Sequence, residues 1–250
     1  MIKNILIITV AGTSSRFSKS LGYDALKCIY EETNKKSILK ILMEYSYGFF
    51  DEIIIVGGYK YAELQQYVEL HFPPRNISLL YNEHYKDYGS NYSLYLGVQE
   101  AIKEEKCNIV FVEGDLIIDK KSFQSICENR QSVITATKDY IRADKSVAFY
   151  QTTNGSIKYI YDTAHKELCV REPFSLIANS GQIWKFADFV ALKDVILSQT
   201  FEDFRDTNLN IVQKYFQQIN SSEYSIINIE KWYNCNTVED YYDAIKNMEQ

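Results

Sequence analysis

The sequence predicts an α/β protein with a three-layer α/β/α arrangement around a mostly parallel sheet. In the first half, apolar runs of strand length alternate with helical patterns in the order β-α-β-α-β-α-β, which is typical of a parallel sheet with helices on both faces. The 250 residues are 46% hydrophobic, which is enough for one substantial core. Internal repeats, low-complexity tracts and a Pro/Gly linker are absent, so we expect a single domain over 1–250.

The individual elements follow from the apolar patterns and the turn residues between them. Strands are expected at 4–10, 52–57, 77–81, 108–112, 132–137, 146–151, 157–161, 176–182 and 224–229. Helices are expected at 37–48, 60–71, 91–104, 120–128, 186–198, 206–217 and 238–248. The middle region, 132–182, has several strands and few helices, which predicts an antiparallel insertion or an extension at the edge of the sheet.

Composition excludes several classes of partner and site. A net charge of −6 argues against nucleic acid as a partner, because non-specific binding needs a basic face. No apolar run approaches the roughly 18 residues that span a bilayer, and the N-terminus lacks the pattern of a signal peptide. The five scattered cysteines and three distant histidines suggest neither disulfides nor a local metal site. We therefore expect a cytoplasmic protein with no membrane partner.

The loop after the first strand is the strongest candidate for a phosphate-binding site. Its small residues allow backbone N–H groups to approach phosphate oxygens closely, and Arg16 and Lys27 add positive charge. The residues concerned are Ala11, Gly12, Thr13, Ser14 and Ser15. The loop has neither the GxxxxGK[ST] nor the GxGxxG pattern, so by itself it is a weak signal. The alternative is an ordinary strand–loop junction with two solvated cations.

Other strand ends should lie at the same edge of the sheet, because ligands of open parallel sheets bind outside the carboxyl ends of the strands. The segment 113–115 ends a buried strand with Asp115, a residue suited to Mg²⁺; the alternative is a turn or helix-cap aspartate. The segment 57–59 follows another strand. The segment 81–95 is rich in Tyr, Asn and Ser, which suits a base or a small polar ligand, or else a loop that packs on itself.

Taken together, these motifs resemble the small bacterial sugar-phosphate nucleotidyltransferases, with the CTP:phosphocholine cytidylyltransferase branch as the nearest. The resemblance rests on the order of six motifs and is strong over 1–118 and weaker over 178–245. In chain order these motifs are AG-x-x-SR-F, LK, VGGY, YNE-x-Y-x-x-Y-x-x-NYSLYL, GD and W-Y-x-x-NTVEDY. It implies a Rossmann-like mixed sheet of the nucleotidyltransferase type. It also implies transfer of a nucleoside monophosphate, here CMP from CTP, to a small phosphorylated acceptor with release of pyrophosphate, by a monomer or homodimer.

The resemblance also implies roles for particular residues. Arg16 and Lys27 would bind the triphosphate and stabilise charge at the attacked phosphorus, and Asp115 would hold Mg²⁺ with help from Asn236. The nucleotide would lie along the loop residues named above and in a pocket formed by Asn82, Asn91 and Ser93. Catalysis would then consist of positioning and charge neutralisation without a covalent intermediate.

The chain departs from the family pattern at several positions. Ser14 replaces the usual second glycine of the loop and Leu26 the usual proline before the lysine. Asn234 and Asn236 stand where acids usually help to bind metal, and an uncharged amide oxygen binds Mg²⁺ more weakly.

The acceptor-binding half, roughly 130–230, departs as well. Segment 201–206 matches a cage for quaternary ammonium but has Arg205 where an aromatic ring is expected. A guanidinium attracts a carboxylate, so we favour an amino-acid phosphate such as phosphoglutamine as acceptor, as in the phosphoglutamine cytidylyltransferases of capsule pathways, over phosphocholine or a sugar phosphate. Glu172 is a further candidate for acceptor contact. Alternatively, Arg205 is a surface ion-pair residue.

Two other functions stay open from the sequence. The amides at 234 and 236 are compatible with a nucleotide-binding protein that lacks transferase activity. A glycosyltransferase of related fold is disfavoured, because that class usually has a DxD metal motif and Asp115 stands in Gly-Asp-Leu-Ile.

Overall fold

The computed structural model describes residues 2–72, 76–103, 106–144, 147–162, 164 and 166–248. The strands are β1 (Lys3–Val10), β2 (Glu52–Gly57), β3 (Ile77–Tyr81), β4 (Cys107–Glu113), β5 (Leu116–Ile118), β6 (Ser132–Thr137), β7 (Ala148–Thr152), β8 (Ile157–Ile160), β9 (Phe174–Phe186), β10 (Tyr224–Ile229) and β11 (Trp232–Asn234). The helices are α1 (Ser15–Leu21), α2 (Ile38–Ser46), α3 (Tyr61–His71), α4 (Ser90–Ala101), α5 (Lys120–Glu128), α6 (Phe189–Leu197), α7 (Leu209–Gln218) and α8 (Val238–Met248).

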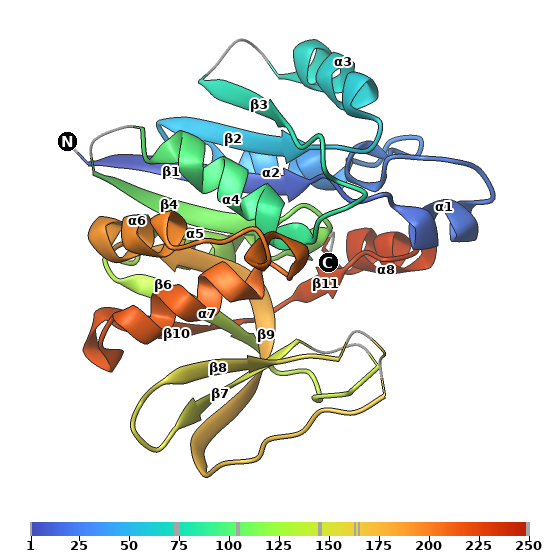
Figure 1. The fold of residues 1–250 in the computed structure, drawn as a ribbon. Coiled ribbons are helices and arrows are strands. Elements are labelled where there is room, and N and C mark those ends of the chain that lie inside the picture. Colours follow the sequence, from blue (N-terminus) through green and yellow to red (C-terminus); the bar gives the residue numbers. More distant parts are fainter. Residues whose placement is uncertain are drawn as a thin grey trace.

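Within the described residues, nine strands form one mixed sheet with the central order β10-β6-β9-β4-β1-β2-β3. The strands β4, β1, β2 and β3 are parallel, β9 runs antiparallel to both β4 and β6, and β6 is parallel to β10. The strands β7 and β8 join the sheet only through the first part of β9, and these three strands form an arm beyond the main sheet (Figure 1). The mixed α/β fold that the sequence predicts is confirmed.

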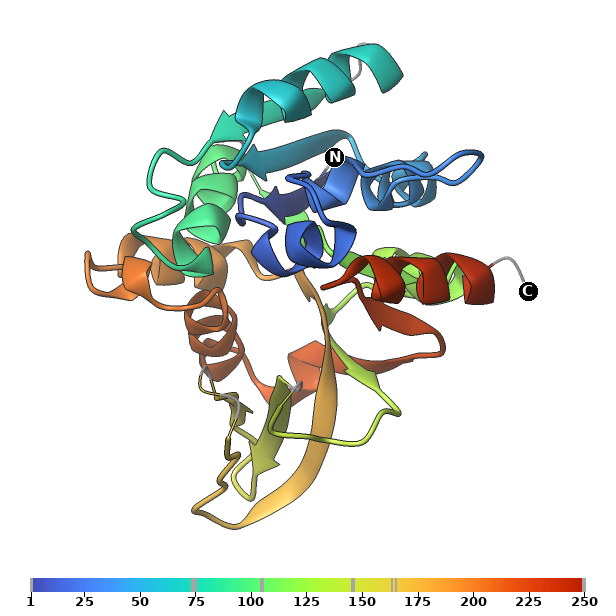
Figure 2. The ribbon, with the colours of Figure 1, turned by 90° about the vertical axis from the view of Figure 1, so that its right-hand side faces the viewer.

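Alternate residues of the central strands pack into separate cores on the two faces of the sheet. Leu6 and Ile8 of β1 lie in a cluster with α2, α3, α5 and α8. Ile5 and Ile7 lie in a second cluster with α4, α6 and α7. Figure 2 shows α4, α6 and α7 on one side of the sheet and α2, α5 and α8 on the other. A strand buried on both faces must be apolar at every position, which explains the continuous run at 5–8.

Most expected elements are present, with differences that have local causes. The helix expected from 186 begins at Phe189, because β9 continues through Phe186 to pair with β4 and Asp188 caps the helix by accepting from the N–H groups of Val190 and Ala191. The sequence analysis missed α1, which buries only Phe17, and the three-residue strands β5 and β11, which are too short for a periodic signal. Position 104 of one expected helix and position 146 of one expected strand lie outside the described residues.

Candidate active site

A cavity of about 260 Å³ lies at the carboxyl end of the parallel strands. It is lined by Thr9, Val10, Ala11, Gly12, Ser14, Leu26, Lys27, Cys28, Asn82, Tyr85, Tyr88, Gly89, Ser90, Ser93, Glu113, Gly114, Asp115 and Asn208. Many of these residues lie at or after the carboxyl ends of β1, β3 and β4, the strand ends that the sequence analysis singled out, whereas the segment at 26–28 and Asn208 come from elsewhere in the chain. The segment 57–59 supports the lining instead: Gly58 packs under Tyr85, where an added Cβ would lie 2.5 Å from the Tyr85 Cβ.

The loop after β1 is tied to Lys27 by Ser14. Ser14 adopts the left-handed conformation with φ 53°, which explains why glycine is the usual residue at this position of the loop. Its Oγ accepts a hydrogen bond from the backbone N–H of Lys27 at 3.2 Å. The serine side chain therefore compensates in part for the unfavourable backbone conformation by joining two segments of the cavity wall.

Lys27 and Asp115 form an ion pair inside the cavity. The distance from Lys27 Nζ to Asp115 Oδ2 is 2.9 Å, and the two side chains are only 16% and 22% exposed. Lys27 is the one cationic side chain among the described residues that line the cavity. An ammonium group that is partly desolvated in this way interacts strongly with a bound anion.

Glu113, two residues before Asp115, is a site residue that the sequence analysis quoted but did not select. Its Oε1 accepts from Asn208 Nδ2 at 2.6 Å and its Oε2 accepts from Gln182 Nε2 at 3.4 Å. Burial and the neighbouring Asp115 carboxylate raise the pKa of Glu113 to about 7. Its place as the last residue of the buried strand β4 could have indicated it, because ligands of parallel sheets bind at the carboxyl ends of the strands.

The raised pKa predicts a pH dependence of stability that Glu113→Gln removes. Between the ordinary pKa of 4.5 and about 7, the folded chain keeps a proton that the unfolded chain has released, so the free energy of unfolding falls as pH rises through this window. Urea unfolding from pH 4 to 8 should show Glu113→Gln gaining stability relative to the parent protein as pH rises. A difference that is constant across this range would contradict the assignment.

A polar pair and aromatic rings form another part of the cavity wall. Asn82 is buried, and its Nδ2 donates to Ser93 Oγ at 2.9 Å while its Oδ1 accepts from the N–H of His84 at 2.9 Å. The ring of Tyr88 stacks on His84 with centroids 4.5 Å apart. The Tyr-rich segment thus packs on itself and also lines the cavity through Tyr85 and Tyr88.

A cysteine nucleophile is disfavoured. Cys28 lines the cavity, but burial raises the pKa of its thiol to about 12. The thiolate is the nucleophilic form of cysteine, and it is scarce at neutral pH for such a group. The described residues that line the cavity therefore offer no cysteine thiolate as a nucleophile at neutral pH.

Asn91 lies outside the cavity and anchors the neighbouring loop, 199–208. The side chain is buried, and its Nδ2 donates to Gln199 Oε1 at 2.8 Å and to the carbonyl of Asp203 at 2.9 Å. Gly89 is part of the same contact, because an added Cβ there would lie 1.9 Å from the carbonyl oxygen of Asp206. This close approach places Asn208, at the end of the loop, against Glu113.

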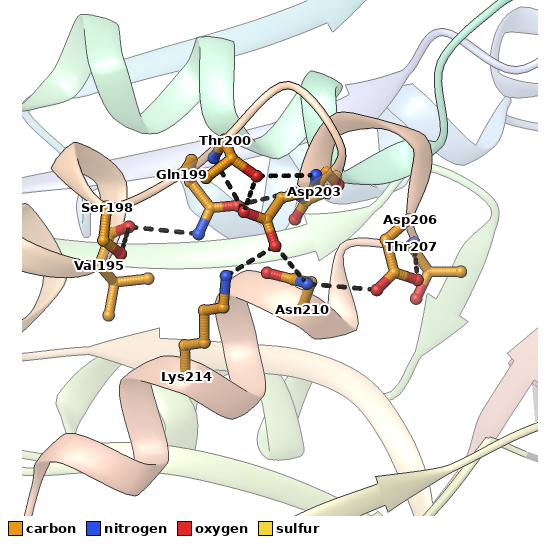
Figure 3. Close-up of polar contacts among 10 residues, drawn as sticks. Val195, Ser198, Gln199, Thr200, Asp203, Asp206, Thr207, Asn210 and Lys214 are labelled. Carbon is orange, nitrogen blue, oxygen red and sulfur yellow. Dashed lines mark hydrogen bonds and ion pairs between the residues drawn. The ribbon is translucent and has the colours of Figure 1, made fainter.

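The carboxylate of Asp203 organises this loop (Figure 3). Its Oδ1 accepts from Lys214 Nζ at 2.7 Å and Asn210 Nδ2 at 3.0 Å, and its Oδ2 accepts from the N–H and hydroxyl of Thr200 at 2.8 and 2.7 Å. Burial alone would raise the pKa of Asp203, but these hydrogen bonds outweigh it and hold the pKa well below its usual range. The loop is therefore rigidly held.

Replacing this carboxylate should destabilise the protein. We expect Asp203→Ala to lower the free energy of unfolding by about 2 kcal/mol, because several charge-assisted hydrogen bonds are lost. The difference in the free energy of unfolding should be largest above the ordinary carboxyl pKa of 3.8. It should shrink as the pH falls below that value, because Asp203 stabilises the fold only in its ionised form. Urea unfolding measures both. The control is Glu202→Ala in the same loop, whose partner Arg205 is 3.7 Å away at the surface; an equal loss there would contradict the special role of Asp203.

Several residues proposed from the sequence do not line the cavity. Arg16 is exposed on the first turn of α1, next to Ser15, and Thr13 is exposed in the loop. Asn236 precedes α8, where its backbone N–H donates to Asp240 Oδ2 at 3.0 Å. Thr13 and Arg16 lie within two residues of a lining residue in the sequence, whereas Asn236 does not, and the roles of all three toward a ligand stay predictions.

The two acceptor candidates lie apart from each other. Arg205 is 58% exposed, pairs with Glu202 and lies over the ring of Phe201 at 5.3 Å. Its backbone nevertheless adjoins the cavity. A Cβ atom added to Gly89, which lines the cavity, would lie 2.8 Å from the carbonyl oxygen of Arg205. Glu172 lies against the arm, where it accepts from Lys158 Nζ at 2.5 Å and the hydroxyl of Tyr150 at 2.8 Å.

Asp115, which lines the cavity, and Asn234, which lies nearby without lining it, carry oxygen atoms that suit a magnesium ion. Asp115 Oδ1 is buried and has no hydrogen-bond partner among the described residues, and the same holds for Asn234 Oδ1. Within the described residues, no group of three or more His, Cys, Asp or Glu side chains forms a complete cage. Mg²⁺ commonly binds through one or two protein oxygens together with substrate phosphates and water, so the residues present fit it.

Solved structures share this fold over nearly the whole chain. The inositol-1-phosphate CTP transferase from T. maritima has a TM-score of 0.68 at 14% identity, covering 100% of this chain and 97% of that one. The CTP:phosphocholine cytidylyltransferase from Streptococcus pneumoniae has a TM-score of 0.67 at 18% identity, covering 99% and 100%. A UDP-glucose pyrophosphorylase complexed with UDP-glucose has a TM-score of 0.66 at 13% identity, covering 100% and 99%. At these identities the likeness shows the nucleotidyltransferase fold.

Among the described residues, no helix is long and apolar enough to cross a membrane.

Comparison of the sequence with known sequences and family models gives a match to a family model. No curated protein sequence matches the chain. A family model described as Domain of unknown function (DUF6564) matches residues 23–248, which span the cavity-lining segments from Leu26 to Asn208. The chain therefore belongs to the DUF6564 family.

Proposed function

We propose that this protein is a nucleotidyltransferase that moves CMP from CTP to a small phosphorylated acceptor and releases pyrophosphate. The observation that carries the proposal is the Lys27–Asp115 pair at 2.9 Å in a cavity at the carboxyl end of a parallel sheet, beside a small-residue loop. This arrangement provides positive charge and oxygen ligands at the site where polyphosphates bind in such sheets. The nucleotidyltransferase fold of the solved structures supports it.

In the proposed reaction, an oxygen of the acceptor phosphate attacks the α-phosphorus of CTP. A new phosphorus–oxygen bond forms, the bond to the β-phosphate oxygen breaks, and that oxygen leaves with pyrophosphate. Lys27 stabilises the negative charge that accumulates on the α-phosphate, and the loop amides near Gly12 and Ser14 bind the phosphate chain. Asn82 and Ser93 bind the nucleoside. Magnesium, held by Asp115, supplies additional charge neutralisation when bound.

The finer assignment of CTP and of an amino-acid phosphate as acceptor rests on the sequence resemblance and on Arg205 beside the cavity. The acceptor would lie against the half of the chain at roughly 130–230, with Arg205 at its carboxylate. Such a product would serve the modification of capsules or other surface polysaccharides. A sugar phosphate or phosphocholine is the alternative acceptor.

A nucleotide-binding protein without transferase activity is the second candidate, favoured by the uncharged Asn234 and Asn236. The experiment that separates the two is pyrophosphate release with Mg²⁺, each of the four nucleoside triphosphates, and a panel of acceptors comprising phosphocholine, sugar 1-phosphates and amino-acid phosphates. Release with one pair of substrates establishes the transferase. Binding of CTP without release for any acceptor supports the second candidate.

A further inference from the structure

A short strand pair brings together the backbones of two residues, Asp115 and Asn234, that each carry an unpartnered side-chain oxygen. The antiparallel pairing of β5 with β11 sets Asn234 opposite Leu116, and the N–H of Cys235 donates to the carbonyl of Asp115 at 2.8 Å. Asp115 Oδ1 and Asn234 Oδ1 are both buried without a hydrogen-bond partner among the described residues. Buried acceptors that lack a protein donor are costly unless a water molecule or a cation binds them, and a pair that includes a carboxylate favours the cation.

The amide of Asn234 can serve as a cation ligand only in one orientation. A carboxylate presents two equivalent oxygens, whereas an amide presents one oxygen and one NH₂ group that repels a cation. Asn234 Nδ2 donates to Gln182 Oε1 at 3.4 Å, and this contact leaves Oδ1 available. Gln182 Nε2 donates in turn to Glu113 Oε2 at 3.4 Å. The carboxyl group of Glu113 therefore orients the amide of Gln182, which orients that of Asn234.

Gln182 reaches both neighbours because it lies in a β-bulge. The register of β9 against β6 shifts between Ile134 and Ala136, and Gln182 has φ 54°, a left-handed conformation that is unusual for a residue with a side chain. Thr135 Oγ1 donates to the carbonyl of Ile183 at 2.7 Å. Trp232 Nε1 of β11 donates to the carbonyl of Gly181 at 2.8 Å. Contacts on both sides thus hold the bulge in a conformation that the residue would not adopt alone.

We propose that Gln182 is a positioning residue of a divalent-cation site, where it turns Asn234 so that its Oδ1 joins Asp115 Oδ1 as a ligand. The proposal rests on the proposed function in so far as that function requires a cation at Asp115. It explains how an amide can replace the acid that usually stands at this position: the lost charge is not restored, but the single oxygen is aimed at the cation. Substitution of a residue that orients a metal ligand in this way commonly lowers metal affinity by about 10- to 100-fold.

The test is a double-mutant cycle on cation binding by the full chain without nucleotide, with Mn²⁺ as the probe and titration followed by electron paramagnetic resonance. Gln182→Met removes both hydrogen bonds at similar volume and should weaken Mn²⁺ binding about tenfold. In an Asn234→Asp background the ligand has two equivalent oxygens and needs no orientation. There Gln182→Met should change the affinity by less than about twofold.

Outcomes against the proposal are distinct. An equal loss of Mn²⁺ affinity in both backgrounds would indicate a merely structural role for Gln182 and so contradict the proposal. The proposal would also be overturned if Gln182→Met left the Mn²⁺ affinity of the parent protein unchanged, or if the parent protein did not bind Mn²⁺ saturably. If Gln182→Met does not fold, Gln182→Gly replaces it, because glycine adopts a positive φ without strain. If the double-mutant cycle gives the expected Mn²⁺ affinities but the protein transfers no nucleotide to any acceptor, the proposed function is refuted and this inference is not. Transfer with Mn²⁺ affinity independent of Gln182 would refute this inference alone.

Discussion

Lys27→Ala should lower kcat/KM for pyrophosphate release by about three orders of magnitude, the largest effect that we expect from a single substitution. Lys27 is the one cation among the described residues that line the cavity, and its ammonium is largely shielded from water. A bound triphosphate would therefore lose its main positively charged protein contact. The substitution would remove more stabilisation from the transition state, where negative charge accumulates, than from the bound substrate. We therefore expect kcat to fall and KM to rise.

The fold should survive this substitution, because Lys27 contacts the remainder of the site through one ion pair and one backbone hydrogen bond that alanine retains. Thermal unfolding and circular dichroism test that expectation. Lys19→Ala is the matched control, since Lys19 is an exposed lysine on α1 that does not line the cavity. Turnover by Lys27→Ala at the parental rate would show that Lys27 does not act on the substrate.

Asp115→Asn should raise the Mg²⁺ concentration for half-maximal activity about tenfold or abolish activity altogether. In the proposed cation site, the substitution removes the only negative charge of the two ligands, because Asn234 is already neutral, and two neutral ligands would bind Mg²⁺ weakly. It also removes the ionic partner of Lys27. Activity measured across a Mg²⁺ series should show a shifted curve whose plateau is approached only at high concentration.

The matched control is Asp243→Asn, an exposed aspartate on α8 outside the cavity. It should leave the Mg²⁺ curve unchanged, because the removed charge is screened by solvent. A parental Mg²⁺ curve for Asp115→Asn would contradict the assignment of Asp115 as a cation ligand. A uniform loss of activity at every Mg²⁺ concentration would instead indicate that Asp115 acts by holding Lys27.

Much of the fold follows from local patterns that the sequence displays directly. The apolar run at Ile5–Ile8 predicts a strand buried on both faces, and the order of strands and helices in the first half predicts the parallel part of the sheet. The carboxyl ends of parallel strands meet at one edge, so the sequence alone places the loop after β1, Asn82 and Asp115 close together. The cavity indeed contains all three.

The sequence was less informative wherever a contact depends on the register or path of distant segments. Asn91 has the appearance of a pocket residue in its motif, yet it anchors the loop at 199–208, because that loop folds back across α4. Asn208 and Gln182 have no local signal at all. They reach Glu113 only through the position of that loop and through the bulge in β9.

Local patterns in the sequence were sufficient for the strands, for the helices of ordinary length and for the edge at which a site forms, and they marked Lys27 and Asp115 as separate candidates for that site. These features depend on the periodicity of neighbouring residues and on a general property of parallel sheets. The tertiary structure alone decided that β9 crosses from the arm into the main sheet, that Gln182 lies in a left-handed bulge, and that Asn234 lies beside Asp115. Such features depend on strand pairing between segments distant in the sequence, which for β5 and β11 are more than 100 residues apart, and short-range patterns do not encode that pairing.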